Sequence, residues 1–465
     1  MSSDELELYD SDIGEEIEEA EKIEFLNRED VELEMKTLIS DVESIVEVNA
    51  GMCRNLLHKF KWNKEALLNK MYESGDTQQF LIDSQVMAKC DDKVKEAKEG
   101  DCDICCSFGV LIGLDCNHMA CKECWKMYLK EKIVDNGICE IECMVPECNL
   151  LMEESKIANY TTNSFILAKY RYQSINGYVA ASSRLKWCPG IDCGRIVKIP
   201  DAETRLIVCE CETRFCFNCC QEFHDPIDCR LMKKWLIKCS DDSETSNWLN
   251  TNTKDCPKCS VPIEKNGGCN HMRCTNNKCK HAFCWMCMKA WEHHKENGYK
   301  CNIFDESKEK SRSETRALLE RWLFYYNRYM NHLQSLQLEE KLKVKVSAKE
   351  EELQKNSTMT WVDVQFLSKS VSALSECRRT LMYTYAFAFY LKKNNNSEIF
   401  ESNQRDLEMA TENISGYLER ELETKDLKTL RQKVQDLSRY VDQRRKALLN
   451  HCEEGVENDF WDFSE

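Results

Sequence analysis

Positive charge is scarce in this sequence. Its 64 Lys and Arg residues are outnumbered by 81 Asp and Glu residues, which gives a net charge of −17, whereas nucleic-acid binding needs clustered cations to neutralise phosphate. Long apolar runs are also missing, since a membrane span needs about 20 such residues. The longest candidate, residues 381–391, is shorter, carries tyrosines and is predicted to be a buried helix. Both absences argue against a nucleic-acid or membrane partner.

The N-terminal residues do not have the composition of a secretory signal. Residues 1–7 are acidic and lack the basic and apolar regions that such a signal contains. The sequence therefore predicts a protein of a reducing intracellular compartment, cytoplasmic and with the nucleus as a second location.

Cysteine is abundant and unevenly placed. Of the 30 cysteines, only Cys53, Cys90, Cys377 and Cys452 lie outside residues 102–301. In a reducing compartment such a density indicates metal ligands rather than disulfides. A chain of 465 residues also holds several domains. The distribution predicts a zinc-rich middle between two cysteine-poor ends.

The first cysteine cluster has the ligand order of an interleaved two-zinc RING, in which pairs one and three hold one metal and pairs two and four the other. Metal binding supplies the folding free energy of such a module. Cys106 and Cys139 are left over and are predicted to be small buried hydrophobes. The predicted ligands are Cys102, Cys105, Cys116, His118, Cys121, Cys124, Cys143 and Cys148.

The second cluster uses its ligands sequentially, four for one zinc and the next four for another. Between them, residues 195–199 and 205–208 are apolar or alternating and are predicted to be the strands of one hairpin. The predicted ligands are Cys188, Cys193, Cys209, Cys211, Cys216, Cys219, His224 and Cys229.

The third cluster has one cysteine more than two zincs require. The pairs Cys256/Cys259 and Cys284/Cys287, closed by His294 and Cys301, leave Cys269, Cys274 and Cys279 to compete for two places, and spacing alone allows either choice.

Two glycines before Cys269 favour it as the extra cysteine, because they clear side chains from its sulfur. A thiol next to His271 in a rigid loop is a candidate nucleophile; the alternative is a structural knuckle with a spare cysteine. With Cys269 set aside, seven cysteines and one histidine per cluster make 24 ligands, enough for six zinc ions.

The flanking regions lack such clusters. Residues 1–29 are predicted to be a disordered acidic tail, and residues 30–90 a three-helix bundle in which Asn63 caps a helix. A helical connector (153–184) and a hinge-like linker (233–253) separate the zinc modules. Residues 303–465 carry apolar residues at helical spacing, including a stripe over 427–441, and are predicted to form an antiparallel bundle.

The order of these parts resembles that of the RING-between-RING ubiquitin ligases, and within them the Ariadne subfamily. The resemblance covers most of the chain beyond residue 50 and is most specific in residues 256–259, 267–271, 284–287, 326–332 and 381–385. It implies a multidomain fold in which small zinc-stabilised α+β modules are flanked by two helical domains. These are a ubiquitin-associated-like domain (30–90), a first RING (98–152), an in-between-RING domain (185–232), a catalytic second RING (254–302) and an Ariadne-type helical domain (303–465).

The resemblance also implies a two-step transfer. A ubiquitin-charged conjugating enzyme binds the first RING, where Ile104 matches the family's contact residue. Ubiquitin passes to Cys269 as a thioester, and a substrate lysine then attacks it, with His271 as general base.

Several positions depart from the family's pattern. Ala282 stands where many members have a catalytic glutamate, so that either His281 substitutes for it or no carboxylate is needed, and Met144 stands where proline is commoner. The missing glutamate supports an alternative function, a catalytically impaired zinc scaffold that binds conjugating enzymes or cullin complexes.

In this family the helical domain covers the catalytic cysteine and holds the enzyme inactive. The matching residues are Leu338, where phenylalanine is frequent, and Glu339, Glu401 and Glu412. The expected partner that releases it is a modified cullin-RING ligase, recognised through the N-terminal helices.

Overall fold

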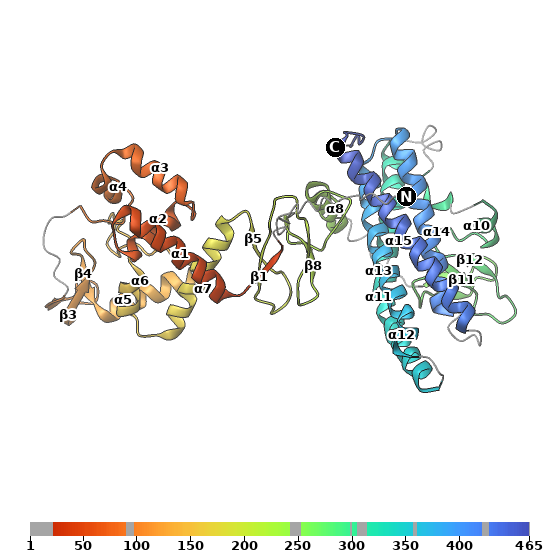
Figure 1. Ribbon diagram of the computed structural model, residues 1–465, viewed down its shortest axis with the longest axis horizontal. Coiled ribbons are helices and arrows are strands. Elements are labelled where there is room, and N and C mark those ends of the chain that lie inside the picture. The colour runs from red at the N-terminus through yellow and green to blue at the C-terminus, as the bar shows by residue number, and fades with distance from the viewer. Residues whose placement is uncertain are drawn as a thin grey trace, which may run out of the picture. The chain divides into compact units, whose positions relative to one another are not determined.

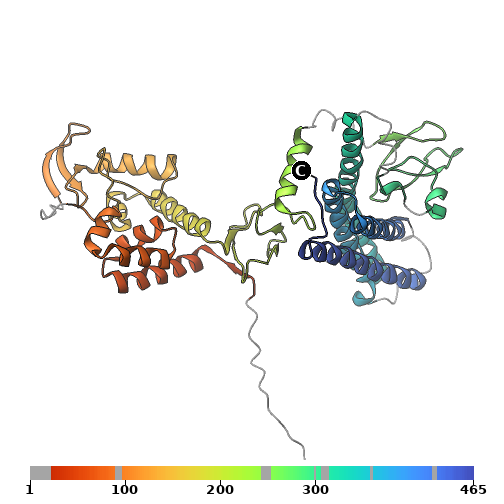
Figure 2. The same cartoon turned by 90° about the horizontal axis from the view of Figure 1, so that it is seen from above.

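The structure is a computed structural model that describes residues 22–89, 97–241, 253–297, 300–304, 314–356, 360–420 and 427–464. It divides into two compact units, Met1–Phe223 and His224–Glu465, and each is described by itself (Figure 1 and Figure 2). Among the described residues no helix combines the length and the apolarity that crossing a membrane requires.

Four helices, rather than the three predicted, follow the N-terminal segment: α1 (Arg28–Val46), α2 (Ala50–Lys59), α3 (Lys64–Ser74) and α4 (Thr77–Asp83). The predicted cap is confirmed, since the Asn63 side chain accepts a hydrogen bond of 2.9 Å from the Ala66 amide. The four helices share an apolar core with two residues of a later helix, Ile175 and Val179.

The last part of the predicted acidic tail is ordered. Strand β1 (Glu24–Leu26) pairs antiparallel with β6 (Ile196–Lys198), and Ile23 and Phe25 pack against the core of the second zinc module. The prediction of a disordered tail over 1–29 is wrong for these residues. It was based on the acidic composition of the whole segment, in which the few apolar residues at 23–26 carry little weight. Residues 1–21 lie outside the described residues.

The first zinc module combines a three-stranded antiparallel sheet with one helix. The strands are β2 (Ala97–Asp101), β3 (Phe108–Gly113) and β4 (Met119–Cys121), in the order β2-β3-β4. Helix α5 (Lys122–Lys130) follows and continues into a π-helical turn, η1 (Glu131–Asp135). Trp125 is fully buried, and its indole N–H donates to the Ile112 carbonyl at 2.9 Å. The connector is helical as predicted, with α6 (Glu154–Tyr160) and α7 (Ser164–Ala181).

The second zinc module contains two separate strand pairs, so the single predicted hairpin is wrong. Strand β5 (Leu185–Trp187) pairs with β6, and β7 (Leu206–Val208) pairs with β8 (Arg214–Cys216). Each pair encloses two of the predicted ligands, Cys188 and Cys193 in the first and Cys209 and Cys211 in the second. The metal-binding turns therefore decide which strands pair.

The third zinc module also has two short hairpins. Strand β9 (Thr253–Asp255) pairs with β10 (Pro262–Glu264), and β11 (His271–Arg273) pairs with β12 (Ala282–Cys284). Helix α10 (Glu292–Asn297) and the short 3₁₀ turn η2 (Lys300–Asn302) complete it. Cys269 lies in the loop between β10 and β11.

Part of the predicted linker is a packed helix. Helix α8 (Cys229–Asp241) buries Trp235 completely, with its ring centroid 4.8 Å from that of Trp322 and 5.3 Å from that of Tyr329. The apolar face of residues 233–241 has an apolar partner far along the chain, and the hinge role of the linker over 233–253 stays a prediction. Residues 242–252 lie outside the described residues.

The C-terminal region is the predicted helical bundle. Its long helices are α11 (Glu314–Asn356), α13 (Phe366–Tyr390), α14 (Asn395–Arg420) and α15 (Leu427–Glu457), with a short α12 (Trp361–Val364) between the first two. Within the stripe predicted over 427–441, Val434 and Val441 are fully buried and face the core. The third zinc module lies beside this bundle in both views (Figure 1 and Figure 2).

Candidate active site and zinc centres

The structure brings the predicted zinc ligands together in groups of four. In each of five such groups the ligand atoms all lie within 4.8 Å of one another. The first RING is interleaved and the later modules are sequential, as spacing predicted. The groups are Cys102/Cys105/Cys121/Cys124, Cys116/His118/Cys143/Cys148, Cys188/Cys193/Cys209/Cys211, Cys216/Cys219/His224/Cys229 and Cys256/Cys259/Cys274/Cys279.

The distances between sulfur atoms fit zinc. Sγ–Sγ separations are 3.6 Å for Cys105–Cys121, 3.7 Å for Cys193–Cys209 and 3.9 Å for Cys256–Cys279. A tetrahedron with Zn–S bonds of about 2.3 Å has edges of about 3.8 Å, whereas the sulfurs of a disulfide lie about 2.05 Å apart. The clusters are zinc-binding sites.

The remaining predicted group surrounds His294. Its Nε2 lies 3.3 Å from the sulfur of Cys287 and 3.9 Å from that of Cys301, and Cys284 contacts both of these thiols. This donor set of three thiols and one imidazole also suits zinc.

Neither of the two cysteines predicted to be small buried hydrophobes is fully buried. Cys106 is exposed. Cys139 is half-buried and its sulfur lies 3.1 Å from Nε2 of His58. Cys106 directly follows the turn that contains the ligand Cys105, whereas Cys139 packs against the edge of the apolar core of the first zinc module.

Cys269 is separate from the five zinc groups above, and it is buried, with 3% of its surface exposed. Carboxylate side chains of the helical bundle accept hydrogen bonds from the backbone around Cys269. The amides of Gly268 and Cys269 donate to the same oxygen, Glu419 Oε1, at 2.9 and 3.1 Å. The Asn270 side-chain amide donates to Glu412 Oε1 at 3.1 Å, and its backbone amide donates to the same carboxylate.

The two glycines before Cys269 are needed for this contact. A Cβ atom at Gly267 would lie 2.4 Å from Glu419 Oε2, and one at Gly268 would lie 3.2 Å from an Arg378 nitrogen. The sequence interpretation, that glycines clear space around the sulfur, is therefore incomplete, because the space they leave is filled by side chains of the bundle.

A buried lysine ties the same loop to helix α11. Lys265 is 2% exposed, and its amine donates to Asn331 Oδ1 at 2.7 Å and to Ser335 Oγ at 3.0 Å. Ser335 in turn donates to the Gly268 carbonyl at 2.9 Å. Burial first, and then the nearby Arg378 guanidinium, lowers the pKa of Lys265 to about 8.

Arg378 holds the acidic side chains in position. It is fully buried and forms ion pairs with Glu339 and Glu412, the latter at 3.2 Å. It also donates to Ser415, which donates to Glu419 Oε1 at 2.9 Å. Burial raises the pKa of Glu339 despite its guanidinium partner. Removing one charged side chain from such a buried set lowers the free energy of unfolding, because the remaining charges stay buried without their counter-charge.

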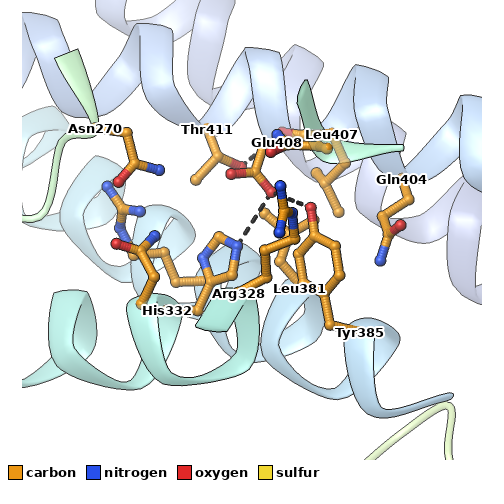
Figure 3. A network of polar contacts seen from close by, with 12 residues as sticks. Asn270, Arg328, His332, Leu381, Tyr385, Gln404, Leu407, Glu408 and Thr411 are labelled. Carbon is orange, nitrogen blue, oxygen red and sulfur yellow. Dashed lines mark hydrogen bonds and ion pairs between the residues drawn. The ribbon is translucent and has the colours of Figure 1, made fainter. Parts of the chain in front are cut away.

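A second polar network lies behind this one. His332 Nε2 is 3.1 Å from Glu408 Oε2, to which the Tyr385 hydroxyl donates at 2.9 Å. Figure 3 shows these side chains between helices, with Asn270 reaching toward them from the Cys269 loop. Burial acts to raise the pKa of Glu408, but His332 and Tyr385 outweigh it and the pKa is lowered. Both networks lie between the same helices.

The four residues assigned to the helical domain by resemblance have different places. Glu412 contacts the Cys269 loop directly, and Glu339 supports it through Arg378. Glu401 lines a small pocket with Arg321 and Lys393 and lies about 16 Å from Glu412 along α14, by the rise of an α-helix; its assignment to this contact stays a prediction. Leu338 is half-buried.

Sequence reasoning missed most of the contact residues. For Ser415 and Glu419 a signal was present, a row of polar residues at helical spacing on an otherwise apolar face of α14, at positions 408, 412, 415 and 419. The missed residues are Lys265, Asn270, Asn331, Ser335, Arg378, Ser415 and Glu419.

His271 stacks on Trp291, with ring centroids 4.1 Å apart and an interplanar angle of 10°. Ala282 lies on the same face of the β11–β12 pair as His271, since directly opposite residues share a face and the register is His271 to Cys284 and Arg273 to Ala282. His281 stacks on Phe283 instead, and Phe283 faces the other side. His281 is therefore not in a position to replace the family's glutamate.

Ile104 lies between two ligands of the first RING and is 56% exposed. Phe108, Val110 and Met127 of the same module are also more than half exposed. This module therefore presents large apolar side chains to solvent, as interaction surfaces do.

Family models match four parts of the chain. The UBA-like domain of the E3 ubiquitin-protein ligase ARIH1 matches residues 33–73, an IBR domain described as a half RING-finger domain matches 168–229, a further IBR domain matches 251–306 and the Ariadne domain matches 320–462.

Curated relatives are similar over almost the whole chain. The E3 ubiquitin-protein ligase ari-1.1 of Caenorhabditis elegans is 55% identical over 95% of this chain and 90% of its own length. The human E3 ubiquitin-protein ligase ARIH1 is 43% identical over 96% of this chain and 83% of its own. A solved structure, Pediculus humanus Parkin bound to phospho-ubiquitin, is 24% identical and covers 42% of this chain and 67% of that chain with a TM-score of 0.23.

A chain with this identity and coverage shares the family of its relatives. It belongs to the Ariadne subfamily of the RING-between-RING ubiquitin ligases.

Proposed function

We propose that this ubiquitin ligase accepts ubiquitin from a conjugating enzyme onto Cys269 as a thioester and transfers it to a substrate lysine. The thiolate of Cys269 attacks the thioester carbonyl, and the sulfur of the conjugating enzyme leaves. A lysine amine then attacks the new thioester, His271 takes its proton, and Cys269 leaves. Trp291, stacked on His271, orients the imidazole.

We further propose that the helical bundle holds the enzyme inactive. The observation that carries this is the burial of Cys269, 3% exposed, in a loop whose amides are bound by Glu412 and Glu419. Ubiquitin cannot reach a buried sulfur, so the bundle has to separate from the loop before transfer. We name the arrangement with these contacts the closed state.

Other parts of the proposal concern metals and partners. Six zinc ions are expected, two in each module. The conjugating enzyme binds the first RING at Ile104, which is exposed. A modified cullin-RING ligase, recognised by the N-terminal helices, is the proposed partner that separates the bundle from the loop. A cytoplasmic location, with the nucleus as a second one, is part of the same proposal.

The test uses the full chain and the charged conjugating enzyme. In a Cys269→Ser, Glu412→Ala variant, ubiquitin is expected as an oxyester that resists thiol, and with Cys269 restored as an adduct that thiol removes. Glu412→Ala removes the carboxylate that accepts both Asn270 hydrogen bonds. Hydrogen bonds to a charged group are worth about 1.5–3 kcal/mol each and these two exist only in the closed state, so activity is expected to rise by roughly tenfold or more.

Glu401→Ala is the matched control, because Glu401 belongs to the same helix but lies away from Glu412, and it should leave activity near the parent's. Equal activity of the Glu412→Ala variant and the parent would count against the closed state. Absence of both adducts, with conjugating-enzyme binding intact, would favour a zinc scaffold instead.

A further inference from the structure

The loop before Cys269 presents two backbone N–H groups to one point. In the closed state that point is occupied by Glu419 Oε1, 2.9 Å from the Gly268 nitrogen and 3.1 Å from the Cys269 nitrogen. Ser415 donates to the same oxygen at 2.9 Å. A single negatively charged oxygen is thus held by two consecutive amides, one of which belongs to the nucleophile.

This geometry is that of an oxyanion hole. Attack on a thioester carbonyl turns its oxygen into an oxyanion, and donors about 2.7–3.1 Å from that oxygen stabilise it. The acyl carbon is bonded to the Cys269 sulfur during transfer, which places its oxygen close to the amide of the same residue. The Gly268 amide lies between two residues without a side chain, and the Cys269 amide is preceded by one, so little of the loop itself covers these donors.

We propose that the Gly268 and Cys269 amides form the oxyanion hole for acyl transfer at Cys269, and that the Glu419 carboxylate occupies it in the closed state as a stand-in for the oxyanion. The proposal rests on the proposed function, because it requires a thioester at Cys269. It assigns the site a ligand class, an oxyanion or carboxylate oxygen.

Both steps of the transfer use the site in the same way. When the Cys269 thiolate attacks, a C–S bond forms and the carbonyl π electrons move to oxygen; as the oxyanion collapses, the bond to the conjugating enzyme's sulfur breaks. When lysine attacks, a C–N bond forms, His271 removes the amine proton and the C–S bond to Cys269 breaks. The oxygen gains and loses the same charge each time, so one pair of amides serves both.

The test removes one N–H group while leaving the side-chain volume similar. Gly268→Pro removes the amide hydrogen, and Gly268→Ala, which keeps it, is the matched control. Both are made in the full chain with Glu412→Ala, so that the loop is released in each. Zinc content, measured for both, reports whether the third zinc module still folds.

Two rates are compared for each variant. One is the single-turnover passage of ubiquitin from the charged conjugating enzyme to Cys269, and the other is alkylation of Cys269 by iodoacetamide, followed by mass spectrometry. Alkylation displaces iodide from a saturated carbon and forms no oxyanion. Relative to Gly268→Ala, Gly268→Pro is expected to lower the rate of ubiquitin transfer on the order of a hundredfold. The rate of alkylation is expected to stay within about twofold, because alkylation has no oxyanion for the amide to stabilise.

Other outcomes overturn the proposal. Equal transfer rates for the proline and alanine variants mean that the Gly268 amide stabilises no oxyanion. A parallel fall in transfer and alkylation means that the loop conformation, not the amide, was responsible. If the proline variant loses zinc, the same comparison is made with a semisynthetic chain in which an ester replaces the Cys269 amide. Absence of any ubiquitin adduct in the Gly268→Ala control would instead contradict the proposed function itself.

Discussion

At the scale of single residues, Gly267 shows how closely the catalytic loop and the bundle fit. A methyl group there would lie 2.4 Å from Glu419 Oε2, well inside van der Waals contact, so the carboxylate would have to move. Overpacking of this kind costs about 1–3 kcal/mol, and the cost falls on the closed state alone.

Gly267→Ala is therefore expected to raise autoubiquitination by roughly fivefold or more, by the conversion of about 1.4 kcal/mol per factor of ten. Gly416→Ala, on helix α14 with nothing within 4 Å of the added atom, is the control and should not activate. Activity at or below the parent's in Gly267→Ala would show that the loop accommodates the methyl group.

Lys265 makes the closed state sensitive to pH. Its pKa in the structure is about 8, against roughly 10.4 for a solvated lysine. Below pH 8 the amine is charged in both the folded and the unfolded protein, so the free energy of unfolding does not change with pH on its account. Between about 8 and 10.4 the solvated amine binds the proton more tightly than the buried one, so the free energy of unfolding of the C-terminal unit rises with pH.

The expected slope from Lys265 is at most about 1.4 kcal/mol per pH unit. It is measured by urea unfolding of the full chain between pH 7.5 and pH ~10, as the difference between the parent and Lys265→Met. Lys343→Met, at an exposed position of helix α11, is the control. Identical slopes for the parent and Lys265→Met would rule out this role for the buried amine.

At the scale of helices and strands, α8 begins at the second zinc module's last ligand and packs on the bundle with Leu231, Met232 and Trp235. Trp235 is fully buried among Trp322, Tyr329 and Phe389. Trp235→Ala is expected to lower the free energy of unfolding by about 3–5 kcal/mol, as for other buried large-to-small changes. Leu236→Ala, next to it but 39% exposed, should cost less than about 1 kcal/mol. Urea unfolding measures both, and comparable losses would mean that α8 is not anchored at Trp235.

The same elements show what the sequence could and could not predict. The close ligand pairs follow from spacing because each turn closes within a few residues, whereas the choice among Cys269, Cys274 and Cys279 also depended on the two glycines before Cys269. The docking of α8 and the pairing of β1 could not be predicted, since Trp235 and Phe25 meet partners far away in the chain. Likewise, Glu412 was found through resemblance, while Arg378 and Glu419 were missed, because charged residues on a helix are usually solvated and the polar row on α14 does not by itself show that its members are buried.

At the scale of the whole molecule, the zinc modules and the helical bundle are stabilised by different means. The second and third modules have small apolar clusters, so metal binding has to supply much of their folding free energy. The bundle has a continuous apolar core that includes Leu381, Phe387 and Phe400. A zinc chelator is therefore expected to abolish ubiquitin transfer while most of the helical circular dichroism remains. Loss of the helical signal in step with zinc release would show that the bundle depends on the metal sites.

The fit between Gly267 and Glu419 also bears on inheritance. Glycine is the residue without a Cβ atom, so every missense change of this codon adds one at a point where it would lie 2.4 Å from a carboxylate oxygen. Such alleles are expected to free the enzyme rather than silence it, and one copy beside a normal one would then suffice for an effect. Changes that remove the Cys269 sulfur leave the normal copy to act and are expected to be recessive, so two neighbouring codons of one loop would differ in dominance.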